Sequence, residues 1–236
     1  MAERSPLTPA DLATIEAAVR QAEARTAGEI YCIVAEESSH YLETPLAWAA
    51  GVSLLAPAIL LLGGIHVSVP DLFGDWTAAQ VGQIAETAAR RALVGAILLQ
   101  AVLFAVVGVI VALRPIRLAL TPRGVKRHSV RRRAAELFLT KRLHMTRART
   151  GVLIFVSLAE RMAELIADEG IASHVDRHVW DRAMAALSEG LRRGEPGAGF
   201  AAAVGLCGDV LAERFPADPK DNPNQLPDTV VVLPRH

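Results

Sequence analysis

Four acidic side chains lie next to apolar runs that have the character of buried strands. Glu29 opens one such run, Glu160 follows another, and Asp168 and Glu169 close a third. Carboxylate oxygens are ligands that divalent cations such as calcium prefer, and metal-assisted hydrolysis needs several of them to converge on one point. These four residues are therefore candidate metal ligands. The alternative, and the more ordinary role for acids in turns, is that all four are solvated.

The sequence carries few other signs of catalysis. It has no phosphate-binding glycine loop, no His-Glu zinc motif and no nucleophile elbow. His174 and His178 are one helical turn apart, but without a third ligand nearby they favour a helix surface over a transition-metal site. Cys32 and Cys207 lie in apolar patterns without metal-ligand spacing, so we expect buried, inert thiols.

Short apolar runs and longer periodic segments predict an α/β fold with a small mixed sheet flanked by helices. Strands are expected at 29–35, 152–156 and 162–167, the last two forming a hairpin. A turn is expected at 118–124, and residues 229–233 could pair briefly as a further strand. Helical periodicity begins after the Thr8 cap and recurs at about 126–145, 175–193 and 200–215.

Two long apolar runs, about 46–65 and 93–113, interrupt this pattern. Each has about 20 residues, enough for a helix to span the roughly 30 Å hydrocarbon core of a bilayer, and neither contains a charged residue. Because lipid offers no partners to backbone amides, the two runs predict a transmembrane helical hairpin. The alternative is a pair of buried helices in a large soluble core, although soluble helices this long usually keep a polar face.

The cations near these runs predict the orientation of the hairpin. Most of them follow the second run: Arg114, Arg117, Arg123, Lys126, Arg127, Arg131, Arg132 and Arg133. By the positive-inside rule this segment is cytoplasmic, and after two crossings the N-terminal segment is cytoplasmic too. We therefore expect a multi-pass protein of a bacterial inner (plasma) membrane, with both termini cytoplasmic and no removable signal peptide. The basic block from Arg114 to Arg133 is expected to contact anionic lipid.

The hairpin is expected to interrupt one soluble domain. Residues 1–43 would supply the first helix and strand, 44–115 the hairpin, and 116–216 the rest of the domain. Residues 217–236 are rich in Pro, Asp and Asn and are expected to form a mostly disordered tail. The net charge of zero argues against nucleic acid as a partner.

Several segments resemble the TPM domain family, in a bacterial membrane branch of mostly uncharacterised proteins with a transmembrane hairpin inside the domain. The matching segments are Thr26 to Ile30, Arg149 to Ser157, Glu160-Arg161, Ile166 to Ile171, Gly194 to Gly199 and Phe215-Pro216. The resemblance implies helices on both sides of a small sheet. It also implies that some relatives bind divalent cations near the strand ends, and that a lumenal member has been assigned phosphatase activity. Many relatives have an Asp-Asp-Arg-like element after the central strand, where this chain has Ala159-Glu160-Arg161 and so lacks one acid.

Three functions from different classes follow from these patterns. The favoured one is a membrane-anchored interaction or quality-control module with a cytoplasmic TPM-like domain, since residues suited to catalysis are sparse. The second is a divalent-metal-dependent phosphatase that acts through Glu160 and neighbouring acids. The third is an oligomeric membrane-transport accessory, in which the hairpin associates around Gln100, a polar side chain within the second apolar run.

Overall fold

The computed structural model describes residues 7–63, 81–146, 149–172, 174–218 and 226–234, and at 60–61, 81–92 and 177 it describes the backbone only. The chain divides into two compact units. Residues 1–40 and 123–236 form one, which we call the α/β unit, and residues 41–122 form the other, which we call the helical unit.

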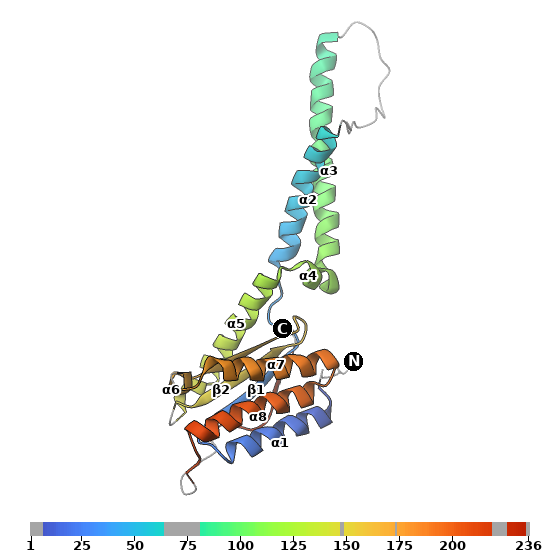
Figure 1. Ribbon diagram of the computed structural model, residues 1–236. Helices are drawn as coiled ribbons and strands as arrows, with labels where there is room; N and C mark the ends of the chain where they lie inside the picture. Colours follow the sequence, from blue (N-terminus) through green and yellow to red (C-terminus); the bar gives the residue numbers. More distant parts are fainter. Residues whose placement is uncertain (1–6, 64–80, 147–148, 173, 219–225, 235–236) are drawn as a thin grey trace. The chain divides into compact units, whose positions relative to one another are not determined.

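The α/β unit combines segments from both ends of the chain (Figure 1). It contains α1 (Pro9–Glu23), β1 (Glu29–Ala35), α5 (Arg123–Thr140), the 3-10 helix η1 (Leu143–Met145), β2 (Gly151–Ser157), β3 (Met162–Ala167), α6 (Glu169–Ala172), α7 (Arg177–Arg193), α8 (Pro196–Arg214) and β4 (Val231–Leu233).

The four strands form one mixed sheet in the order β3-β2-β1-β4. β1 runs parallel to β2, with Glu29 opposite Gly151 and Ala35 opposite Ser157, and parallel to β4. β3 runs antiparallel to β2 after a tight turn and forms one edge of the sheet. The two central strands, β1 and β2, therefore come from opposite sides of the helical unit in the sequence.

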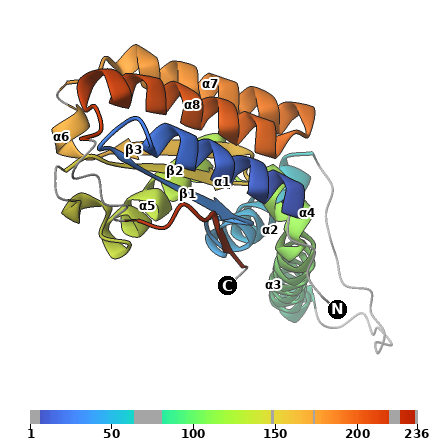
Figure 2. The ribbon, with the colours of Figure 1, turned by 90° about the horizontal axis from the view of Figure 1, so that it is seen from below.

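Helices cover both faces of the sheet (Figure 2). Side chains of α1, α7 and α8 pack on one face, against residues that include Ile30, Cys32 and Ile154. Side chains of α5 pack on the other, against residues that include Tyr31 and Phe155. Every residue of β1 and β2 is buried, as expected for parallel strands covered on both faces.

Close backbone contacts hold α7, α8 and α1 together. A Cβ atom on Gly190 of α7 would lie only 2.4 Å from the Cα of Gly199 in α8, so the two helices can meet here only because both residues lack side chains. The start of α8 is tied to α1, since the Gly197 amide donates to Asp11 Oδ1 at 3.2 Å. Asp11 also completes the capping box of α1 with Thr8.

The helical unit contains α2 (Glu43–Leu62), α3 (Val81–Ala112) and α4 (Arg114–Leu120). α2 and α3 pack against each other. Ala49 is fully buried in this contact, and a Cβ on Gly108 would lie 3.7 Å from the Ala49 Cβ. The hydroxyl group of Thr44, in the first turn of α2, is hydrogen-bonded at 3.0 Å to that of Thr121, which follows α4.

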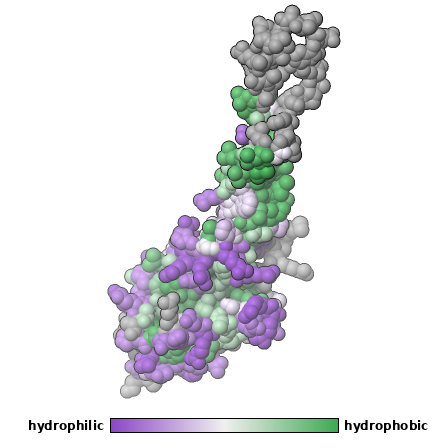
Figure 3. Space-filling model, turned by 45° about the horizontal axis from the view of Figure 1, so that its top comes forward, coloured by the Kyte–Doolittle hydropathy of each residue, from purple (hydrophilic) through white to green (hydrophobic). Residues whose placement is uncertain are grey.

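Large apolar side chains are exposed along α2 and along α3 from Leu93 onward (Figure 3). Among the described residues, one helix is long and apolar enough to cross a membrane, with its span at Leu93–Ala112, and only 11% of that span is buried. The second expected span, 46–65, coincides with α2 up to Leu62, and residues 64 and 65 lie outside the described part of the chain.

Two local expectations are wrong, and a third is confirmed. The turn expected at 118–124 is short, because α4 runs to Leu120 and α5 begins at Arg123. The helix expected to reach Met145 ends at Thr140, and a left-handed Arg142 turns the chain so that Met145 is exposed. The strand that residues 229–233 could form is present as β4, which extends the sheet beside β1, and Leu226 and Val230 also pack against the core.

Candidate interaction groove

The four acids proposed as metal ligands lie at opposite ends of the sheet. Glu29 and Asp168 are at the end where β1 and β2 begin, because the Asp168 amide donates to the Gly151 carbonyl and Gly151 pairs with Glu29. Glu160 lies in the turn that follows β2. A strand of the length of β2 spans about 20 Å, so Glu160 cannot share a metal ion with the other acids.

The acids at the first end do not form a calcium site either. Glu29 Oε2 accepts a hydrogen bond from the Leu226 amide at 3.1 Å, and the exposed Glu169 lies 3.9 Å from Arg149. Asp168 Oδ1 accepts from the Glu169 amide at 2.7 Å. Among the described residues, no three His, Cys, Asp or Glu side chains are arranged to hold a metal ion. Calcium needs about six to eight oxygen ligands, so these residues do not fit it.

Glu160 acts as a hydrogen-bond acceptor that joins distant segments. Its Oε1 atom accepts from the Ser38 amide at 3.0 Å and from the Ser38 hydroxyl at 2.7 Å, and its Oε2 atom accepts from the Ser157 hydroxyl. The residue is 7% exposed. This environment ties the ends of β1 and β2 together and leaves little of the carboxylate open to a substrate.

His174 and the two cysteines make contacts that belong to the fold. His174 Nδ1 lies 3.0 Å from the Gly170 carbonyl oxygen, and its ring meets Phe215 edge-on. Cys32 and Cys207 are both buried in the core, as expected, and burial raises the pKa of each thiol, that of Cys207 to about 12.

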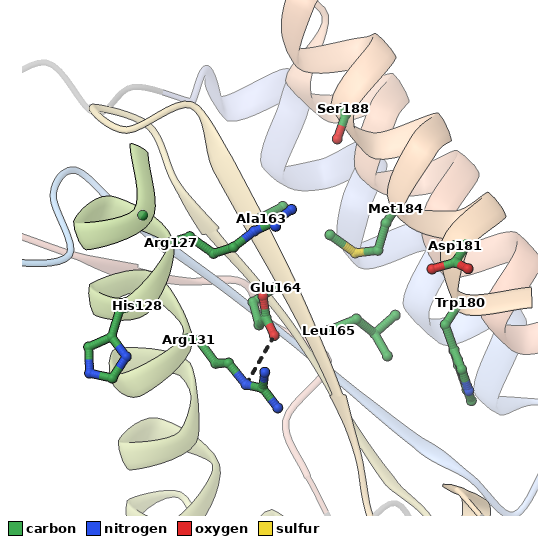
Figure 4. Close-up of a pocket in the computed structure, with 11 residues that line it drawn as sticks. Arg127, His128, Arg131, Ala163, Glu164, Leu165, Trp180, Asp181, Met184 and Ser188 are labelled. Atoms are coloured by element: carbon green, nitrogen blue, oxygen red, sulfur yellow. Dashed lines mark ion pairs between the residues drawn. The ribbon is translucent and has the colours of Figure 1, made fainter. Parts of the chain in front are cut away.

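A hollow of the α/β unit lies beside the edge strand β3, between α5 and α7 (Figure 4). Its volume is about 730 Å³. We call this hollow the β3 groove. Its floor is formed by Ala163, Glu164 and Leu165 of β3. All six residues of β3 are only half-buried, in contrast to the fully buried β2.

One wall of the β3 groove is basic. Arg127 and Arg131 of α5 line it and lie one helical turn apart, while Val130 and Ala134 anchor the same helix to the sheet. Arg131 Nε lies 3.9 Å from Glu164 Oε1. Burial raises the pKa of Glu164, and the charges of Arg131 and Arg127 act in the opposite direction.

The opposite wall is largely apolar. Trp180, Met184 and Ser188 follow one another at four-residue intervals along α7, so all three lie on one side of the helix. Figure 4 shows Trp180 and Met184 on the side of α7 that faces β3, with Arg127 and Arg131 extending toward β3 from α5. Asp181 is the acidic residue of this wall.

A second hollow, of about 500 Å³, adjoins the groove at Ser188, which lines both. Three arginines, Arg161, Arg192 and Arg193, contribute to its lining. Arg192 and Arg193 both pair with Glu189, at 2.5 Å and 3.4 Å. The groove and its extension therefore carry more basic than acidic side chains.

The comparisons with known proteins bear on the fold. No family model matches the chain, and no curated protein matches it. A solved structure, the NMR structure of the BA42 protein from the psychrophilic bacterium Bizionia argentinensis, is similar with a TM-score of 0.54 and 17% sequence identity. The alignment covers 98% of this chain and 97% of that one. This is a likeness of fold. The relationship to the TPM domain family stays a prediction.

The sequence does not identify the residues of the β3 groove as a group. The sequence places Arg127 and Arg131 in the basic block expected to contact lipid, and it places Trp180 and Met184 within the helix expected at 175–193. A signal that is present in the sequence is that the strand beginning at Met162 comes last in its hairpin, so one of its edges can remain open.

Proposed function

We propose that this chain is an integral protein of a bacterial inner membrane whose α/β unit, a cytoplasmic TPM-like domain, serves as an interaction module for another membrane complex. The exposed apolar surface of α2 and α3 is the observation that supports membrane insertion. Side chains such as Leu54, Ile59, Leu98 and Val109 are more than half exposed.

The magnitude of this exposure favours lipid over water. Burying a large aliphatic side chain completely is worth about 1.5–3 kcal/mol. Fifteen large apolar side chains of α2 and α3 are at least 42% exposed. At about 1 kcal/mol for each half-exposed side chain, the total is comparable to the 5–15 kcal/mol that typically stabilises a whole domain. This apolar surface therefore needs to be shielded from water. Lipid can shield it, because both helices are long enough to span the hydrocarbon core of a bilayer.

Strand pairing supports a hairpin with two crossings. β1 precedes the helical unit in the sequence and β2 follows it, yet the two strands are hydrogen-bonded neighbours. Both must lie on the same side of a membrane, so the chain between them must cross an even number of times. If α3 crosses, a second crossing is needed, and α2 is the apolar helix available for it. The cations of α4 and α5 favour the cytoplasmic side for the α/β unit.

The interaction part rests on the β3 groove. Its basic and apolar walls and open strand suit a protein partner, whereas the separated acids give no support to metal-dependent phosphate hydrolysis. Arg114 and Arg117 of α4, next to the proposed spans, remain the residues best placed in the sequence to contact anionic lipid.

The membrane part is tested by extraction of the full-length protein from native membranes. We expect it to stay in the pellet at alkaline pH in sodium carbonate and to dissolve only in detergent. Release by carbonate alone would overturn the proposed insertion.

The interaction part is tested by photocrosslinking in the native membrane. A benzophenone amino acid at Ser188, which lines the groove, is compared with one at Ala13, an exposed position on α1. We expect Ser188 to capture a membrane protein that Ala13 does not. Recovery of the chain alone from both positions would contradict the proposal.

A further inference from the structure

The pairing of β3 with β2 fixes which backbone groups point away from the sheet. The Asp168 amide donates to the Gly151 carbonyl, so this is a hydrogen-bonded pair at the start of the antiparallel ladder. Such pairs alternate along the ladder, so Ile166, Glu164 and Met162 also direct their backbone groups to β2. The N–H and C=O groups of Ala163, Leu165 and Ala167 consequently point outward, to the open edge.

This edge has one charged side chain and lacks the other usual protections of an edge strand. Natural edges are blocked by Pro, by Lys, by bulges or by a covering segment. β3 contains neither Pro nor Lys, and its six residues pair with β2 in continuous register. Its charged residue, Glu164, lies near Arg131. Within the described part of the chain β3 has β2 as its only neighbouring strand, and Ala163 and Leu165 line the groove.

The walls of the groove define what a strand added here would need. Successive side chains of a strand point to opposite faces. One set would face Arg127 and Arg131 on α5, and the other would face Trp180 and Met184 on α7. Carboxylates in the first set would match the arginines of α5, and aliphatic side chains in the second set would match the apolar wall of α7. Arg161, in the adjoining hollow near the Met162 end of β3, extends the same preference for negative charge.

We propose that an extended segment of a partner protein, with alternating acidic and aliphatic side chains, adds as a fifth strand to the outer edge of β3. Backbone hydrogen bonds to Ala163 and Leu165 supply the affinity, and the two unlike walls supply the specificity. This inference rests on the proposed function, because it names the chemistry of the partner that the interaction module takes.

The test uses the full-length protein in detergent micelles and a fluorescein-labelled peptide with the sequence Asp-Val-Glu-Leu-Glu-Val-Asp. Fluorescence anisotropy measures binding, and hydrogen exchange measures protection of the β3 amides. We expect saturable binding below about 1 mM and slower exchange at Ala163 and Leu165. We also expect at least tenfold weaker binding of a peptide with Lys in place of Asp and Glu. Absence of binding at 1 mM, or equal binding of both peptides, overturns the proposal.

Two matched substitutions separate strand addition from general charge attraction. Ala163→Pro removes an outward N–H but no bond to β2, so the sheet should be retained while binding falls at least tenfold. Arg131→Glu should weaken binding by a similar factor, whereas Arg132→Glu, which makes the same charge change at a residue paired with Glu136, should change it less than twofold. Undiminished binding to a folded Ala163→Pro protein overturns strand addition.

The remaining outcomes distinguish this inference from the proposed function. If Ala163→Pro leaves crosslinking from Ser188 to the membrane partner unchanged, the groove binds its partner in another way and only the strand proposal fails. If carbonate releases the protein from membranes, the proposed function fails whatever the peptide does. If the purified protein forms dimers that Ala163→Pro dissociates, the occupant is a second copy of this chain and the proposed partner is wrong.

Discussion

Glu160 and Ser38 are hydrogen-bonded although 122 residues separate them in the chain. The Ser38 amide and hydroxyl both donate to the same carboxylate oxygen, at 3.0 Å and 2.7 Å. Since Ser38 follows β1 and Glu160 follows β2, this contact ties together the two strand ends between which the helical unit is inserted in the sequence. Glu160 is thus a positioning residue of the fold.

Replacement of Glu160 by Ala should destabilise the α/β unit. Hydrogen bonds to a charged acceptor contribute about 1.5–3 kcal/mol each, and the substitution leaves the Ser38 and Ser157 donors without this acceptor. We expect a loss of about 2–4 kcal/mol, measured by pulse proteolysis of the full-length protein in detergent with increasing urea. Unchanged stability together with loss of phosphate release from an aryl phosphate would contradict this account and favour a catalytic role.

Glu23 should make the stability of the α/β unit depend on pH. The pKa of its carboxyl group is raised from 4.5 to about 8, mainly by burial and also by the nearby charges of Glu29 and Asp228. The folded state therefore holds a proton that the unfolded state loses between pH 4.5 and 8. Stability should fall as the pH rises through this window.

The variant Glu23→Gln tests this dependence. Gln cannot lose a proton, so the variant should remove a fall on the order of 2 kcal/mol between pH 5 and 8, a figure reduced because the carboxyl is partly exposed. Glu213→Gln, at an exposed position on α8, is the matched control and should leave the pH profile unchanged. Identical profiles for the wild type and Glu23→Gln would contradict the assigned pKa.

Ala49 and Gly108 should form a disulfide when both are replaced by Cys. The Cβ separation of 3.7 Å at this pair lies within the range of 3.5–4.5 Å that a disulfide requires. Oxidation in native membranes should therefore give a faster-migrating band on a non-reducing gel. Gly51→Cys with Gly108→Cys is the control, because a Cβ on Gly51 would meet no atom within 4 Å. Equal crosslinking of both pairs would contradict the observed packing of α2 on α3.

The native thiols should be unreactive while the protein is folded. Cys32 and Cys207 are 2% exposed or less, and the thiolate form that reacts is disfavoured by burial. We expect less than about one tenth of the thiols to react with a disulfide reagent at pH 8 in an hour, and both to react in urea. Rapid labelling of the folded protein would mean that the core opens around β1 and α8.

The sequence predicts those elements whose signal is local. Five consecutive apolar residues at Val152–Val156 identify β2, and the cap at Thr8 identifies the start of α1. The sequence predicts poorly those features of the fold that depend on contacts between distant segments of the chain. The proposed metal ligands Glu29 and Glu160 flank similar strands, but the parallel pairing of β1 and β2 puts them at opposite ends of the sheet.

The β3 groove could not be predicted for the same reason. Arg131 and Trp180 line one groove only because α5 and α7 pack on opposite faces of the sheet next to its edge strand. Neither residue has a local signature for this role. Val231–Leu233 also depends on a distant partner, since these residues become a strand by pairing with β1.

Cysteine labelling in intact cells tests the central claim of a membrane hairpin with a cytoplasmic α/β unit. A membrane-impermeant maleimide is applied to Ser68→Cys, between α2 and α3, and to Arg182→Cys, exposed on α7. The account predicts that Ser68→Cys is labelled from outside and that Arg182→Cys is labelled only after the inner membrane is permeabilised. Labelling of Arg182→Cys in intact cells, or protection of both sites until permeabilisation, would contradict it.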